Sequence, residues 1–260
     1  MRILVSNDDG IFAAGLPPLV GALEALGDVR VVAPASEQSA SSHALTMHSP
    51  LRVRKHREGW FSVSGTPADC VYMAINHLLP WRPDLVVSGI NRGGNLSEDV
   101  HYSGTVAAAR EACLVGIKGL AVSLHIDWGA PNDPRTCWET AAALAARVVP
   151  DVAANQIPGC RLFNLNVPDL PLDQVKGIRL CRLGHRNYKI DVTERRDLRG
   201  KRYYWIGGNH EFFDPTPGTD GPAVEDSWAS LTPMRVDLTA DTALPAMSDW
   251  DSVDESPLLG

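Results

Sequence analysis

Two adjacent carboxylates, Asp8 and Asp9, stand directly after a short apolar run near the start of the chain. The run Ile3–Val5 has the length and β-branched content of a buried parallel strand. Neighbouring carboxylates repel each other unless a cation lies between them or water surrounds both. Oxygen ligands suit a hard divalent ion, magnesium or manganese, better than zinc. The stretch Asn7–Gly10 is therefore either an Asx-type turn with solvated carboxylates or part of a metal site.

Two further polar stretches follow predicted strands and could reach the same place. Asn91 comes just past the end of the predicted strand Asp84–Gly89. Ligands bind at the carboxyl ends of strands in open α/β sheets, so we expect Asn91 beside the Asp8-Asp9 pair. The Ser-rich loop Ala35–Thr46 follows another predicted strand. Such a loop is usually only a connection, but its position here could bring one hydroxyl to a bound metal.

A fourth polar stretch, Ser103-Gly104-Thr105, precedes an Ala-rich helix predicted over Val106–Leu114. Backbone N–H groups and hydroxyls at a helix N-terminus form an anion site that suits phosphate. Ordinary N-capping by Ser103 or Thr105 is the alternative, and taken alone it is the commoner arrangement. In combination with a hard-metal cluster we favour the phosphate site.

These polar stretches need a sheet that brings strand ends together. Apolar residues at helical spacing run from Leu16 to Leu26 after the first strand, and the strand Val29–Pro34 follows. This β-α-β order implies parallel strands and a right-handed crossover. We predict an α/β fold with a mainly parallel sheet flanked by helices. The other predicted elements are a hairpin over the sheet (Leu51–Lys55, Trp60–Val63), the strands Gly119–Leu124, Phe163–Val167 and Ile178–Arg182, and the helices Thr66–Leu79 and Thr136–Val149.

The chain changes character at Asn187, where apolar and polar residues alternate and a charged, Gly-containing segment separates two such runs. This pattern predicts a β-hairpin arm that projects from the core, followed by an irregular Pro- and Gly-rich segment over Asp214–Pro222. We therefore divide the chain into a core, residues 1–186, and a C-terminal oligomerisation arm and tail, residues 187–260. The stretch 187–231 is rich in aromatic residues, namely Tyr188, Tyr203, Tyr204, Trp205 and Trp228.

An isolated two-stranded hairpin is marginal in water and cannot bury these aromatic residues against itself. Large exposed apolar patches usually mark interfaces, so we expect the arm to be exchanged with a second copy about a two-fold axis. The alternative is an arm folded back onto its own core.

Composition narrows the class of protein. The 260 residues are 44% hydrophobic, which supports a sizeable core, and carry a net charge of −7. No basic stripe with interleaved aromatics is present, which argues against a long nucleic acid as partner. The five scattered cysteines show no CxxC spacing and favour a reducing cytosol over a zinc site or a disulfide framework. With no signal segment and no run long enough to span a bilayer, we expect a cytoplasmic protein without a membrane partner.

Taken together, the ordered motifs resemble the SurE (survival protein E) family of divalent-metal-dependent nucleotidases over nearly the whole chain. The residues that carry the resemblance are Ser6–Gly10, Ser39, Gly65–Cys70, Ser88–Asn91, Tyr102–Val106, Asn166–Pro171, Thr232-Pro233 and Val236–Thr239. One departure is Ser97, which stands where the family usually has a glycine after the Asn-Leu pair.

The resemblance implies a site and an activity. It implies one divalent cation per subunit, magnesium or manganese, and hydrolysis of nucleoside monophosphates to nucleoside and phosphate. It also implies a Rossmann-like core and an arm exchanged within a homodimer, which can pair into a homotetramer. The implied metal ligands are Asp8, Asp9, Ser39 and Asn91, and the implied phosphate contacts are Asn95, Ser103, Gly104 and Thr105.

Asp8 and Asp9 are the predicted catalytic residues. Either could activate a water as general base or attack the phosphorus through an aspartyl-phosphate. We assign no role to the nearby His43 and His101. The main alternative is a receiver-like signalling module that binds magnesium without turnover, but Asn91 stands where such a module needs an acceptor Asp. A dinucleotide-dependent dehydrogenase is disfavoured because no G-x-G-x-x-G follows the first strand.

Overall fold

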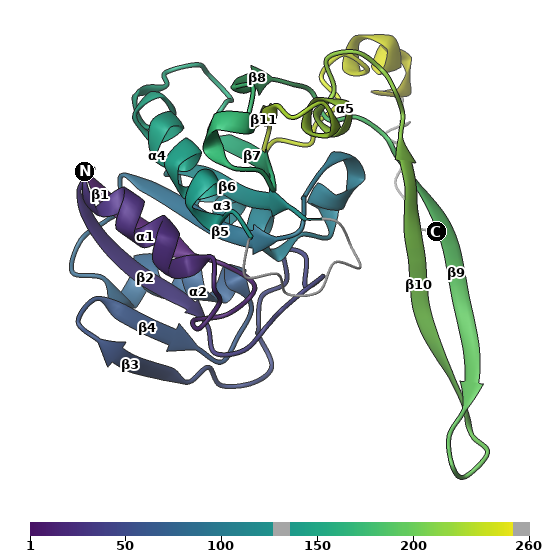
Figure 1. Ribbon diagram of the computed structural model, residues 1–260, viewed down its shortest axis with the longest axis horizontal. Coiled ribbons are helices and arrows are strands. Elements are labelled where there is room, and N and C mark those ends of the chain that lie inside the picture. Colours follow the sequence, from purple (N-terminus) through teal and green to yellow (C-terminus); the bar gives the residue numbers. More distant parts are fainter. Residues whose placement is uncertain (127–135, 252–260) are drawn as a thin grey trace, which may run out of the picture.

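The computed structural model describes residues 1–126 and 136–251, with the side chains of 188–191, 208–212 and 248–251 outside the description. Its strands are β1 (Arg2–Ser6), β2 (Asp28–Pro34), β3 (Val53–Arg57), β4 (Trp60–Val63), β5 (Leu85–Arg92), β6 (Lys118–His125), β7 (Leu162–Pro168), β8 (Ile178–Leu180), β9 (Arg186–Arg196), β10 (Arg202–Phe213) and β11 (Ala229–Met234). Nine of these described strands form one sheet in the order β3-β4-β2-β1-β5-β6-β7-β11-β8, and β9 and β10 form a separate ribbon (Figure 1).

Helices cover both faces of the large sheet. They are α1 (Leu16–Glu24), α2 (Pro67–Met73), α3 (Gly104–Leu114), α4 (Trp138–Ala154) and the short α5 (Asp220–Glu225), with a π-helical turn at Ala74–Leu78 and 3-10 turns at Ser97–His101, Leu172–Gln174 and Leu244–Asp251. Successive strand residues point to opposite faces, so Ile3 and Val5 pack with α1 and α4, while Leu4 packs with α2 and α3. No helix among the described residues has the length and apolarity needed to cross a bilayer.

The predicted α/β fold with a mainly parallel sheet is confirmed. Strand β1 pairs in parallel with β2 on one side and with β5 on the other, and β5, β6 and β7 continue in parallel. The strand order therefore reverses at β1, and this reversal creates a crevice at the carboxyl ends of β1 and β5. Asp8 and Asp9 follow β1, and Asn91 lies at the end of β5, so the topology itself brings the three residues to one crevice.

Two local predictions are corrected. The hairpin β3–β4 does not lie over the sheet; β4 pairs in parallel with β2, so the hairpin extends the sheet edge. The segment Asp214–Pro222 is not wholly irregular, because α5 begins at Asp220. A strand that pattern analysis did not predict, β11, runs antiparallel to β7 and parallel to β8.

The β9–β10 ribbon is the predicted hairpin arm, and Figure 1 shows it extending away from the rest of the chain. It begins within one residue of the expected boundary at 187. After it the chain returns to the sheet through α5 and β11, which differs from the expected assignment of all residues from 187 onward to arm and tail. Trp228, expected in the arm, adjoins β11 and stacks under the guanidinium of Arg179 at 4.3 Å. The side chain of Tyr188 and residues 252–260 lie outside the description.

Candidate metal centre and phosphate cleft

A tight turn built by Asn7 carries the paired carboxylates. Its side-chain Nδ2 donates to the carbonyl of Gly10 at 2.9 Å, and its Oδ1 accepts the Gly10 N–H at 3.1 Å. Gly10 has a φ of +97°, and a Cβ there would lie 3.2 Å from the Ser36 carbonyl carbon, so the position favours glycine. The expected Asx-type turn therefore exists, but its carboxylates are not simply solvated: Asp8 is only 5% exposed.

The surroundings of Asp8 and Asp9 raise the pKa of both carboxyl groups. Burial raises the pKa of Asp8, although its carboxylate accepts the hydroxyl proton of Thr105. Burial and the neighbouring Asp8 charge raise the pKa of Asp9 to about 7, against the backbone N–H of Arg92 that Asp9 accepts at 3.1 Å. Raised carboxyl pKa values mean that the folded chain disfavours two negative charges here. A bound cation would supply the missing positive charge.

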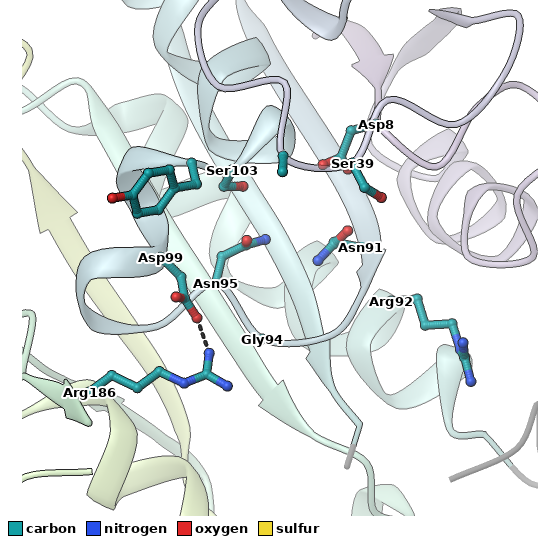
Figure 2. Close-up of a pocket in the computed structure, with 11 residues that line it drawn as sticks. Asp8, Ser39, Asn91, Arg92, Gly94, Asn95, Asp99, Ser103 and Arg186 are labelled. Carbon is teal, nitrogen blue, oxygen red and sulfur yellow. Dashed lines mark hydrogen bonds and ion pairs between the residues drawn. The ribbon is translucent and has the colours of Figure 1, made fainter. Parts of the chain in front are cut away.

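Two neutral oxygens complete the same end of the cleft. Ser39 donates its hydroxyl proton to Glu37 at 2.6 Å, so the lone pairs of its oxygen remain available. Asn91 donates from Nδ2 to the Gly93 carbonyl at 2.7 Å, which leaves its Oδ1 as the acceptor atom. The loop that carries Ser39 is tied to the turn because Gln38 N–H donates to the Asp8 carbonyl at 2.8 Å. Figure 2 shows Asp8, Ser39 and Asn91 gathered at one end of the cleft.

The donor set fits a hard divalent ion. Among the described residues no group of three His, Cys, Asp or Glu side chains could hold a metal, so a zinc-type site is absent from this part of the chain. The cluster offers two carboxylates, one hydroxyl and one amide oxygen, which is the chemistry that magnesium and manganese prefer. The four predicted ligands Asp8, Asp9, Ser39 and Asn91 are compatible with such an ion.

The helix start that should bind phosphate borders the same cleft. The Ser103 hydroxyl oxygen caps α3 by accepting the Val106 N–H at 3.0 Å, and Ser103 also lines the cleft with Asn95. Gly104 lets Asp8 approach, because a Cβ there would lie 2.9 Å from the Asp8 Cβ. Thr105 is fully buried and does not line the cleft. Its hydroxyl donates to Asp8, so it orients a carboxylate in the structure.

The cleft has a volume of about 210 Å³ and a second wall that sequence analysis did not identify. Asp99 and Arg186 form an ion pair on this wall (Figure 2), and Tyr102 also lines the cleft. Arg186 is the first residue of β9, and its guanidinium lies 5.5 Å from the ring centre of Phe213. Neither Asp99 nor Arg186 stands in a pattern that indicates a site; the only signal is that Arg186 marks the junction of core and arm.

The two nearby histidines do not line the cleft. Nε2 of His43 lies 2.7 Å from the Glu111 carboxylate of α3, and the backbone carbonyl of His101 accepts the Ser42 hydroxyl at 2.7 Å. These contacts hold the Ser39 loop against its neighbours.

Comparison with known proteins places these features in context. The family model described as survival protein SurE matches residues 3–190. The 5'-nucleotidase SurE of Pelobacter propionicus is 46% identical over 250 residues, covering 96% of this chain and 99% of that protein. The 5'-nucleotidase SurE of Geobacter sulfurreducens is 47% identical over 251 residues, covering 96% of this chain and 94% of that protein. The crystal structure of the SurE protein from Aquifex aeolicus superposes on this chain with a TM-score of 0.83 at 38% identity, covering 96% of this chain and 100% of that chain.

Proposed function

The chain belongs to the survival protein SurE family, and from that premise we propose that it is a metal-dependent 5'-nucleotidase. It is a hydrolase that converts a nucleoside 5'-monophosphate to nucleoside and phosphate, the activity for which its relatives are named. The receiver-like alternative is not supported, because the family match and the relatives extend over nearly the whole chain. The observation that carries the proposal is the buried Asp8 beside Asp9, Ser39 and Asn91 at the switch point of the sheet.

The proposed metal is one magnesium or manganese ion per subunit, held by Asp8, Asp9, Ser39 and Asn91. When bound, such an ion polarises a phosphoryl oxygen and stabilises charge that develops in the transition state. The protein side chains hold their positions without it: Thr105 fixes Asp8, the Arg92 N–H fixes Asp9, and Glu37 draws the Ser39 proton away from the cleft.

The proposed phosphate contacts are Asn95, Ser103 and the N-terminus of α3 at Gly104 and Thr105. The Val106 N–H of this helix start is already bonded to Ser103, so the N-terminus contributes mainly its partial positive charge, which favours a phosphate group. Asp8 lines the cleft, whereas Asp9 does not. We therefore assign the uptake of a proton from the attacking water to Asp8, in addition to its proposed place as a metal ligand, with Thr105 fixing the orientation of the carboxylate. Asp9 is proposed as a metal ligand only.

We also propose that the β9–β10 arm is exchanged between two subunits, giving a homodimer or a dimer of dimers. The support is exposure: Trp205 is 65% and Ile206 89% exposed, and Val192 and Tyr204 are more than half exposed. The proposed working compartment is the cytoplasm. In support, all five cysteines, each of which lies in the described part of the chain, are thiols.

The function is tested by phosphate release from a panel of esters with the full-length protein. Matched 5'- and 3'-monophosphates of each nucleoside are compared with added magnesium or manganese, and with excess chelator. We expect turnover of 5'-monophosphates that needs the ion and disappears with chelator. Full turnover in excess chelator, or no turnover of any nucleotide with either ion, would refute the proposal.

A further inference from the structure

Two asparagines of β7, Asn164 and Asn166, are fully buried beneath the phosphate end of the cleft. They stand two residues apart on one strand, so their side chains share a face of the sheet. Asn166 accepts the backbone N–H of Asn95 on Oδ1 at 2.8 Å and donates from Nδ2 to the Asn95 carbonyl at 3.1 Å. Asn164 donates from Nδ2 to the same carbonyl at 2.7 Å. Side chains of β7 thus satisfy both backbone groups of Asn95.

The side chain of Asn95 is held as well. Its Nδ2 donates to the Ser123 hydroxyl oxygen at 2.7 Å, and Ser123 is buried in β6. Ser123 pairs in register with Asn166 of β7 on one side and with Asn91 of β5 on the other. A row of polar residues therefore crosses three strands. It runs from Asn91 on β5, a proposed metal ligand, through Ser123 on β6 to Asn166 on β7, which holds the proposed phosphate contact Asn95.

This arrangement matters because Asn95 follows β5 on a loop, and loop residues ordinarily have the freedom to move. Four hydrogen bonds from the sheet remove that freedom. A donor that is already oriented stabilises developing charge without reorganisation during the reaction, and this kind of pre-orientation is a large contribution to catalysis. Every hydrogen-bonding group of the Asn95 backbone, and the Nδ2 of its side chain, has a partner on the sheet, which restricts the residue to this position.

We propose that Asn166 is a positioning residue for the nucleotidase reaction, assisted by Asn164 and Ser123, and that it acts only through Asn95. Asn166 touches neither substrate nor metal; it holds the Asn95 peptide so that the side-chain amide faces the phosphate before the substrate arrives. This inference rests on the proposed function and adds to it a set of residues on β6 and β7.

The test is a double-mutant cycle on the full-length protein with manganese and a nucleoside 5'-monophosphate. We expect Asn95→Ala to lower kcat/KM about 100-fold. Asn166→Ala and Ser123→Ala should each lower kcat about 10-fold with little change in KM. Combined with Asn95→Ala, neither should cost activity beyond the loss that Asn95→Ala causes. Effects that multiply in the double variants would overturn the proposal, because they would mean that Asn166 and Ser123 act independently of Asn95.

The matched control is Thr232→Val. Thr232 pairs in register with Asn164, is 2% exposed, and its hydroxyl has no hydrogen-bond partner in the described part of the chain. Removing the Thr232 hydroxyl should leave kcat within twofold of wild type. A tenfold fall in kcat would mean that any change in this polar face lowers activity, and this would contradict a specific role for Asn166.

Two measurements separate the possible failures. Ser123→Ala removes one hydroxyl only, so its cycle decides the matter if Asn166→Ala does not fold. Hydrogen exchange of the Asn95 backbone amide should be slow in the wild type and at least about 10-fold faster in Asn166→Ala, and equal rates would overturn the positioning role. Absence of turnover by the wild type would overturn the proposed function, and this inference with it. Turnover by the wild type with multiplying effects would overturn the inference alone.

Discussion

The carboxyl edge of the large sheet and the β9–β10 ribbon differ in what surrounds their side chains. At the sheet edge Asp8 and Asn95 are almost wholly buried, and each is held by hydrogen bonds from other elements of the same chain. On the ribbon Trp205 and Ile206 are largely exposed, and the strands pair mainly with each other. The side chains of one chain thus enclose the cleft, whereas the exposed apolar residues of the ribbon are the observation that supports the proposed exchange with a second subunit.

The largest effect is expected from Asp8→Asn. We expect kcat/KM to fall at least about 1000-fold, because the change removes a proposed metal ligand that is also the proposed proton acceptor. Since the folded chain raises the pKa of Asp8, ionisation of this carboxyl costs stability at neutral pH, and the neutral amide should leave the thermal midpoint of the metal-free protein unchanged or higher. Phosphate release and thermal unfolding measure the two effects.

Asp197→Asn is the matched control on the ribbon. Asp197 lies in the turn between β9 and β10, where its Oδ1 accepts the N–H groups of Arg199 and Lys201 at 2.8 and 2.9 Å. The kcat/KM of the Asp197→Asn variant should stay within twofold of wild type. Retained activity in Asp8→Asn, or equal losses of activity in the two variants, would contradict the expectation that the cleft carries the activity and the ribbon does not.

A shortened ribbon should change assembly more than folding. Removing residues 190–208 and closing the remaining strands with an Asn-Gly turn keeps Arg186, Phe213 and the whole of β11 in place. We expect a monomer at micromolar concentration by light scattering, with a cooperative unfolding transition and turnover per chain within about threefold of wild type. Cutting further, to Leu231, would remove part of β11 from the sheet and confound the result.

The full-length chain is the control for this experiment and should be a dimer or larger. A full-length chain that stays monomeric at the same concentration would contradict arm exchange. A shortened chain that keeps the wild-type molar mass would show that subunits associate through the core.

A smaller loss of activity is expected from Thr105→Val. The substitution keeps the shape of a buried side chain but removes the hydroxyl that donates to Asp8. We expect kcat to fall about 10-fold with little change in KM, because the contact orients Asp8, the proposed proton acceptor. Steady-state kinetics decide the matter: values that match the parent would reduce Thr105 to an ordinary residue of the helix start.

The smallest effect is expected at the junction of the two regions, from Ser97→Gly. Ser97 has a φ of +54°, a conformation that disfavours residues with a Cβ, and the Ser97 N–H donates to Asp220 at 2.9 Å. Glycine relieves that conformational cost, but it adds freedom to the unfolded chain and removes the long hydrogen bond from the Ser97 hydroxyl to Asp220 at 3.4 Å. The unfolding free energy should therefore change by at most about 1 kcal/mol.

Ser227→Gly, at a φ of +62° far from the cleft, should give a change of the same size in a denaturant titration. Neither variant should alter turnover more than twofold. A loss of stability above about 1 kcal/mol in Ser97→Gly alone would mean that the Ser97 hydroxyl contributes to the junction with Asp220.

Strand ends could be predicted from the sequence because each buried parallel strand is a run of apolar residues that ends at polar residues. That was enough to expect Asp8, Asp9 and Asn91 in one crevice. Strand β11 escaped prediction because Pro233 normally argues against a strand in a sheet. In the structure β8 pairs with β11 only as far as Leu231, so Pro233 lies beyond the part of β11 that has strands on both sides.

Contacts between distant segments could not be predicted in the same way. The Asp99–Arg186 pair joins residues 87 positions apart, and Asn166 reaches Asn95 across 71 positions. No periodicity or local motif specifies such a pairing; it follows from strand order and register, which only the folded chain reveals. Thr105 illustrates the same point, since its position at a helix start predicted a phosphate contact, while folding presents Asp8 to its hydroxyl.

The most direct test of the central claim is a crystal structure grown with manganese and examined by anomalous scattering at a wavelength selective for that metal. We predict one strong peak per subunit within about 2.5 Å of oxygen atoms of Asp8, Asp9, Ser39 and Asn91. A structure with manganese in the crystal but no peak at these oxygens, or with the strong peak elsewhere on the chain, would refute the proposed metal site.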